Sequence, residues 1–169
     1  DRAMQACGAM VNDQLGRDAA MVQTAVTAKV ERHELQHQID GPLLPLATPV
    51  LRKLGGYADE VKERVNRELS AYVAQCTMTE GSPKLALVIP LRFALLQDRG
   101  VYHHAAVLLF EALAARKLRL GTARVNAPAM AEAYDELMAA DDETIRARAR
   151  AAYEELFDDP LPTVEVASE

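Results

Sequence analysis

The sequence predicts a mainly helical fold on three observations. Alanine, leucine and arginine are abundant, whereas aromatic residues make up only 5% of the chain. Hydrophobic residues account for 50% of the sequence and recur at spacings of three to four rather than alternating. A length of 169 residues suits one domain with a buried core. We therefore expect a single helical domain over residues 1–157 and a flexible tail at 158–169.

Helix boundaries follow from capping residues and helix breakers along the chain. Helices are expected at 2–15, 18–40, 49–54, 59–77, 102–118, 128–139 and 142–157. Gly41 and Pro42 should end the second of these helices, and the sequence at 81–83, Gly-Ser-Pro, indicates a turn. The segment 85–97 could form a short strand, but a helix is favoured. At most a small strand element is expected.

Charge and hydrophobicity exclude two classes of partner. A net charge of -6 and a pI near 5.3 argue against nucleic-acid binding, since phosphates require a basic patch. No uninterrupted apolar run approaches the roughly 20 residues that span a bilayer. The expected partners are therefore a peptide or protein substrate. Because the chain begins at Asp1 rather than Met, the remainder of a longer chain is a further expected partner.

The two cysteines, Cys7 and Cys76, lie far apart and outside any Cys-x-x-Cys spacing. They do not indicate a thiolate metal site, and both are expected to be buried thiols, although a disulfide between them stays open. This use of cysteine favours a reducing compartment such as the cytoplasm.

The sequence at 33–37, His-Glu-Leu-Gln-His, carries the spacing His-Glu-x-x-His within the helix expected at 18–40. Residues four apart on a helix lie above one another, so His33 and His37 can bind one metal ion together. Glu34 is then placed to act as general base, accepting a proton from a metal-activated water that attacks a carbonyl. The alternative is a chance pattern on a polar helix face.

An apolar stripe leads into this motif. Val22, Val26 and Val30 continue at helical spacing into the two histidines, so the core-facing side of the helix is expected to become the metal site. Buried histidines need partners, which favours metal binding over a chance match. The next residue of the stripe, Asp40, is expected either to orient a histidine or to act as a structural partner at the helix end.

A catalytic zinc site usually has three protein ligands and leaves a fourth position for water. Leu43 stands where a longer motif has its third histidine, so the third ligand must lie elsewhere. Glu68 is the expected ligand, because it continues the apolar stripe of Val61 and Val65 at helical spacing. Its carboxylate would be buried there without a partner unless a cation met it. Ala71, one turn further on, would let the two helices approach closely.

These residues resemble the gluzincins, zinc peptidases with His-Glu-x-x-His on one helix and a distal glutamate on the next. The two histidines and Glu34 match the first element, and Glu68 with Ala71 matches the second. The resemblance covers residues 30–75 and implies a zincin-like domain that hydrolyses peptide bonds with a Zn²⁺-activated water. Such peptidases usually place a strand before the motif helix, whereas the sequence upstream of His33 predicts helix.

Zinc peptidases also commonly use a tyrosine or histidine to stabilise the oxyanion of the reaction. The candidates, for each of which ordinary packing is the alternative, are Tyr72, Tyr102, His103 and His104. Two other functions stay open: a non-catalytic helical binding or regulatory domain that retains the zinc site, and a non-peptidase hydrolase with the same chemistry. Glu34 favours an enzyme, because a purely structural zinc site has no use for a base.

Overall fold

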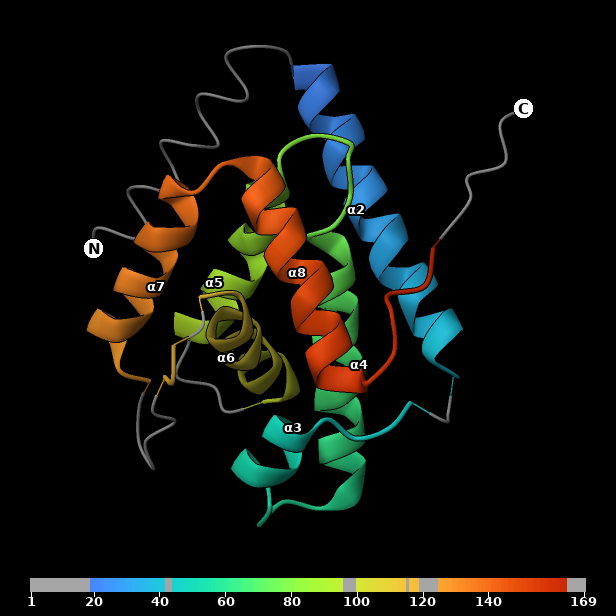
Figure 1. Ribbon diagram of the computed structural model, residues 1–169, viewed down its shortest axis with the longest axis vertical. Coiled ribbons are helices and arrows are strands. Elements are labelled where there is room, and N and C mark those ends of the chain that lie inside the picture. The colour runs from blue at the N-terminus through green and yellow to red at the C-terminus, as the bar shows by residue number, and fades with distance from the viewer. Residues whose placement is uncertain (1–18, 42–43, 96–99, 115, 119–124, 164–169) are drawn as a thin grey trace.

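Helix α4 (Asp59–Gln75) lies at the centre of the computed structural model, and α2, α6 and α8 pack around it (Figure 1). The structure describes residues 19–41, 44–95, 100–114, 116–118 and 125–163. In chain order the other elements are α2 (Ala19–Asp40), α3 (Thr48–Lys53), the 3-10 helix η2 (Pro83–Leu87), α5 (Val88–Leu95), α6 (Val101–Leu113), α7 (Ala127–Ala139) and α8 (Asp142–Phe157). The described part of the chain contains no strand, so the prediction of a mainly helical fold is confirmed.

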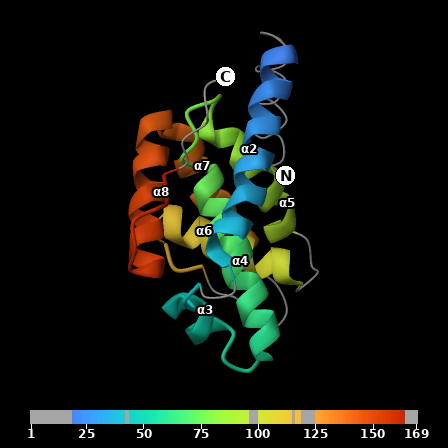
Figure 2. The same cartoon turned by 90° about the vertical axis from the view of Figure 1, so that its right-hand side faces the viewer.

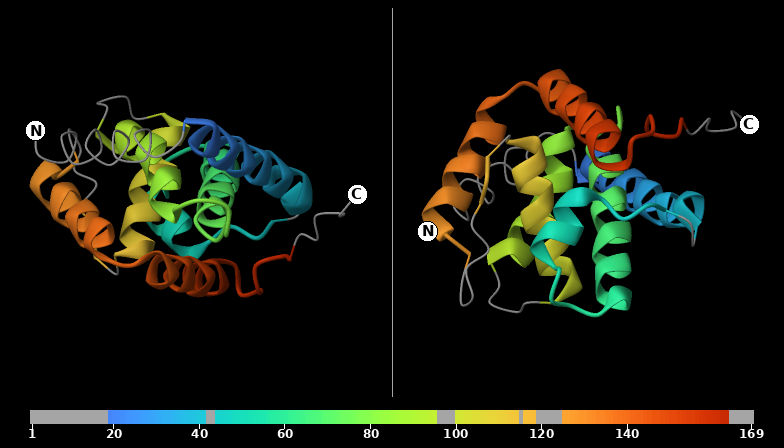
Figure 3. Two further views of the ribbon diagram at one scale, coloured as in Figure 1. Left: turned by 90° about the horizontal axis from the view of Figure 1, so that it is seen from above. Right: turned by 60° about the horizontal axis from the view of Figure 1, so that its bottom comes forward.

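Three long helices run in alternating directions past one another. In the view of Figure 1, α2 descends, α4 rises and α8 descends again. Seen from above, α4 lies between α2 and α8 (Figure 3). None of the helices in the described ranges has the length and hydrophobicity needed to cross a membrane.

The hydrophobic core is centred on α4 and α6. Leu69 and Val73 of α4 are fully buried, as are Leu109 and Phe110 of α6. Burying each such side chain stabilises the fold by about 1.5–3 kcal/mol. Cys76, at the end of α4, is a buried free thiol whose pKa burial raises to about 12, whereas Cys7 lies outside the described residues.

Most helix boundaries expected from the sequence agree with the structure to within two residues. The Asp141 carboxylate accepts a hydrogen bond of 2.7 Å from the backbone N–H of Thr144 and so caps α8. The segment expected at 85–97 is helical where it is described, as the end of η2 followed by α5. Helix α6 ends at Leu113 rather than at 118. The helix expected at 2–15 lies outside the described residues.

The first residues of the expected C-terminal tail pack against the protein. After α8, residues 158–163 turn back and run beside α2 (Figure 1). Leu161 is partly buried against the core, and Arg32 donates a hydrogen bond of 3.3 Å to the carbonyl of Pro162. This segment therefore contacts α2, because a cation on that helix binds its backbone.

Helix α2 packs on the rest of the molecule mostly through polar side chains, which the sequence analysis did not anticipate. Its buried residues are Ala25, Lys29, Arg32, Gln36 and Asp40. By contrast, Val26 and Val30 of the expected core-facing stripe are 42% and 46% exposed. The buried Lys29 ammonium is satisfied by the carbonyl of Glu80, at 3.1 Å. The valine stripe therefore faces away from the core.

The loop between α4 and η2 sets the position of α2. Gly81 in this loop has a φ of +65°, and a Cβ built on it would lie 2.6 Å from the Cβ of Ala25. Glycine is thus required both by the backbone conformation and by the close approach to α2. Arg146 of α8 donates a hydrogen bond of 2.9 Å to the carbonyl of Met78, which ties the same loop to α8.

Candidate metal centre

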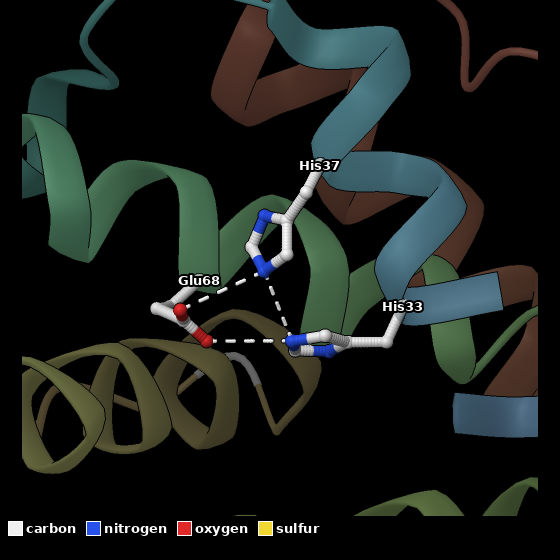
Figure 4. Close-up of side chains that lie close together, drawn as sticks. All are labelled: His33, His37 and Glu68. Atoms are coloured by element: carbon white, nitrogen blue, oxygen red, sulfur yellow. Dashed lines mark hydrogen bonds and ion pairs between the residues drawn. The ribbon is translucent and has the colours of Figure 1, made fainter. Parts of the chain in front are cut away.

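Three side chains from two helices converge at the interface between α2 and α4 (Figure 4). Nε2 of His33 lies 3.1 Å from Nε2 of His37. The carboxylate of Glu68 reaches both rings, with Oε2 at 3.4 Å from His33 and Oε1 at 3.6 Å from His37. Within the described residues, this is the one group of three or more histidine, cysteine and acidic side chains close enough to share a metal ion.

Local helix geometry explains the convergence. The spacing of four places both imidazoles on one side of α2, facing α4 (Figure 4). Glu68 lies in the same helix as the fully buried Val65 and Leu69, so packing of this helix fixes the position of its backbone. Ala71, one turn beyond Glu68, is also fully buried. The three residues predicted from the sequence to lie together are thus adjacent in the structure.

The donor atoms fit a tetrahedral zinc ion. Zinc binds histidine nitrogen and carboxylate oxygen at about 2.0–2.2 Å, which places neighbouring ligand atoms about 3.3–3.6 Å apart in a tetrahedron. The two imidazole nitrogens lie 3.1 Å apart, and each has one of the two Glu68 oxygens at 3.4 or 3.6 Å, which is close to these values. Oε2 of Glu68 is buried and accepts no hydrogen bond from a described residue. A cation at this point would neutralise the buried carboxylate.

Electrostatics also favour the ligand form of His37. Burial lowers the pKa of His37 below its ordinary value, and the neighbouring His33 and Arg67 lower it further. Glu68 and Glu34 act in the opposite direction but do not reverse the shift. A lowered pKa keeps the imidazole neutral at moderately acidic pH, and only the neutral imidazole binds a metal ion.

The second nitrogens of the two rings depart from the usual arrangement. Histidines that bind zinc generally donate a hydrogen bond from the other ring nitrogen to a carboxylate or carbonyl. Nδ1 of His33 and Nδ1 of His37 are both buried without a hydrogen-bond partner among the described residues. Instead, the ring of His33 packs on that of Tyr72, with centroids 5.3 Å apart. Packing therefore orients this ring.

Asp40 takes part in a buried polar network behind the motif rather than in orienting a histidine. Gln36, which is fully buried, donates hydrogen bonds of 2.5 Å to Oδ1 of Asp40 and 3.1 Å to Oη of Tyr153. Burial raises the pKa of Asp40, and hydrogen bonds from Gln36 and Ser70 partly offset the shift. This network joins α2 to α8. Of the two roles expected for Asp40, it supports that of a structural partner at the helix end.

A cavity of about 490 Å³ opens beside the three ligands, and Glu34 lies in its wall. The Glu34 side chain is exposed, and its charge is close enough to raise the pKa of His37. The wall also contains Val26, Lys29, Val30, Tyr72, Gln75, Leu85, Ala86, Ile89, Phe93 and Tyr102. The expected base and the expected metal ligands therefore share one solvent-accessible space.

The candidates for oxyanion stabilisation fall into two groups. Tyr72 and Tyr102 line the cavity, whereas His103 is not among its lining residues. Burial raises the pKa of the Tyr72 phenol, and the charge of Glu68 raises it further, so the phenol keeps the proton that it would donate to an oxyanion. Nδ1 of His103 instead donates to the carbonyl of Phe93 at 3.1 Å, a position that does not support the role expected for it.

Comparisons of the chain with protein-family models, with curated proteins and with solved structures gave no match.

Proposed function

We propose that this chain is a zincin-like, zinc-dependent hydrolase of peptide bonds, with His33, His37 and Glu68 as metal ligands. One observation carries the proposal: two imidazole nitrogens of one helix and the carboxylate of another converge at separations close to those of zinc ligands. The same cavity contains Glu34, the acidic residue of the His-Glu-x-x-His sequence.

The residues around the cavity fit the steps of amide hydrolysis. A bound zinc ion would supply Lewis-acid activation of water and of the substrate carbonyl. Glu34 accepts the proton of the attacking water and delivers it to the leaving amine. Tyr72, which keeps its proton, donates a hydrogen bond to the substrate oxygen as that oxygen becomes negatively charged. The protein forms no covalent bond to the substrate in this scheme.

A non-catalytic helical binding or regulatory domain with a zinc site is the second candidate function. It is favoured by the helical character of the described residues, which offer no strand edge for main-chain pairing with an extended peptide. Glu34 distinguishes the two functions, because a base beside the metal serves turnover and not structure.

The test compares zinc-loaded parent protein with Glu34→Gln on a mixed library of fluorogenic peptides. We expect peptide turnover to fall by about 10²–10⁴-fold, the usual contribution of a general base, while each chain still binds one zinc ion. Glu31→Gln is the matched control, since Glu31 is an exposed glutamate of the same helix that does not line the cavity. Full activity in Glu34→Gln would refute the role of Glu34 as general base, and no activity in the parent protein would favour the non-catalytic domain.

A further inference from the structure

The cavity beside the candidate metal centre has a polar end and an apolar wall. The wall is formed by Val26, Val30, Leu85, Ile89, Phe93 and Tyr102, which come from α2, η2, α5 and α6. Most of these residues come from α2 and α5, both of which are labelled in Figure 2. Val30 is 46% exposed, Ile89 54% and Tyr102 45%. Large apolar side chains that line one solvent-accessible cavity are typical of ligand-binding sites.

The dimensions of the cavity suit a peptide side chain with part of its backbone. Its volume of about 490 Å³ lies within the range of roughly 300–1,000 Å³ found for ligand pockets. The rings of Phe93 and Tyr102 stack with centroids 5.1 Å apart and an interplanar angle of 23°, which gives the wall a flat aromatic surface. This surface belongs to the same cavity as the metal ligands.

The distribution of charge disfavours an acidic occupant. The carboxylates of Glu34 and Glu68 lie at the metal end of the cavity. The cation in the lining, Lys29, is buried and donates to the carbonyl of Glu80 in the loop after α4. In the metal-free chain, a substrate carboxylate near this end would therefore meet like charges. An apolar side chain gains from leaving water whether or not a metal ion is bound.

We propose that this apolar wall selects peptide substrates with a bulky apolar side chain, such as phenylalanine or leucine, next to the bond that is cleaved. The cleavage itself rests on the function proposed above, but the binding preference does not require the metal. Burial of the side chain against Val30, Ile89 and Tyr102 supplies the affinity that a strand edge supplies in other peptide-binding proteins.

The test uses two blocked heptapeptides that differ only in the central residue, phenylalanine or aspartate, on a background of alanine and glycine. Binding is measured by calorimetry to the chelator-treated, metal-free chain and to zinc-loaded Glu34→Gln. We expect the phenylalanine peptide to bind at least about tenfold more tightly in both states.

Two substitutions of Ile89 test whether the apolar wall causes the preference for the phenylalanine peptide. Ile89→Asp places a charge in the apolar wall and should abolish the preference, and the milder Ile89→Ala should reduce it. Leu51→Asp is the matched control, since Leu51 is a 46% exposed apolar residue on α3 outside the cavity lining, and it should leave the preference unchanged. Circular dichroism melts show that each variant remains folded.

Equal affinity for the two peptides, or a preference that survives Ile89→Asp in a folded protein, overturns this inference. A phenylalanine preference in a chain that binds no zinc keeps the inference and contradicts the proposed function. Glu34-dependent cleavage of both peptides at equal rates and affinities supports the proposed function and overturns this inference.

Discussion

The four histidines of the chain form two pairs, and their surroundings differ. His33 and His37 are four residues apart, line a cavity and lie within 3.6 Å of one carboxylate. His103 and His104 are adjacent in the first turn of α6 and are only 7% and 5% exposed, with ring centroids 5.4 Å apart. Adjacent helical residues point in different directions and cannot bind one ion side by side. Spacing and a facing carboxylate, rather than histidine content, therefore distinguish the candidate metal centre from the second pair.

The difference between the two pairs is tested most sharply by removing one histidine from each. His37→Ala should weaken zinc binding by more than about 100-fold, which exceeds the usual cost of losing a residue that only orients a ligand. His103→Ala should keep one zinc per chain and lower the thermal stability, because it leaves a gap in a buried region. Competition with a chromophoric chelator measures the affinities. Equal zinc affinity in the two variants would contradict the distinction.

The carboxylate that faces the first pair is the next residue to test. Glu68→Gln removes the charge and leaves a weaker ligand of the same shape, so we expect zinc affinity to fall by at least about tenfold. Glu63→Gln, an exposed glutamate of the same helix, is the control and should bind zinc like the parent protein. Isothermal titration with zinc would show the difference. A Glu68→Gln affinity equal to that of the control would exclude Glu68 as a ligand.

The buried network behind the motif should matter for stability but little for the metal. Tyr153→Phe removes the hydroxyl that accepts a hydrogen bond of 3.1 Å from Gln36. We expect the free energy of unfolding to fall by about 1 kcal/mol, as measured by urea denaturation, with unchanged zinc stoichiometry. A loss of zinc binding in this variant would show instead that the network orients the histidines.

The smallest expected effect is a pH dependence of the metal-free chain. The pKa of His37 is lowered on folding from its ordinary value of 6.5 by burial, with His33 and Arg67 adding to the shift and Glu68 and Glu34 opposing it. Below pH 6.5 the unfolded chain therefore binds more protons at this residue than the folded chain does, and stability falls as the pH is lowered.

His37→Gln should remove this part of the pH dependence. Urea unfolding of chelator-treated parent and variant between about pH 5 and 8 measures the two slopes. An identical slope of stability against pH in both proteins would show that other groups cause the pH dependence.

The convergence of the three residues of the candidate metal centre could be predicted from the sequence because their signals are local. His33 and His37 are fixed by a spacing of four on one helix, and Glu68 interrupts an apolar stripe on another. The burial of α2 could not be predicted in the same way. Lys29 and Arg32 are typical surface residues, and they are buried because carbonyls 51 and 130 residues away in the chain accept their hydrogen bonds.

The cavity and the role of His103 depend on contacts between elements. The apolar wall assembles from residues of α2, η2, α5 and α6, none of which forms a recognisable motif alone. Val26 and Val30 of the valine stripe, which was expected to face the core, in fact line this cavity. His103 pairs with the backbone of Phe93 on the preceding helix, a contact that depends on how α5 and α6 pack. Residue type and periodicity carry no information about such pairings.

The most direct test of the account is X-ray absorption at the zinc edge of the one-to-one complex, recorded for the parent protein and for Glu68→Ala. We expect four ligands at about 2.0–2.1 Å, two of them imidazoles, with one oxygen ligand changed or lost in the variant. Failure to form the complex, or a spectrum that lacks imidazole or is identical in Glu68→Ala, would contradict a zinc site at His33, His37 and Glu68.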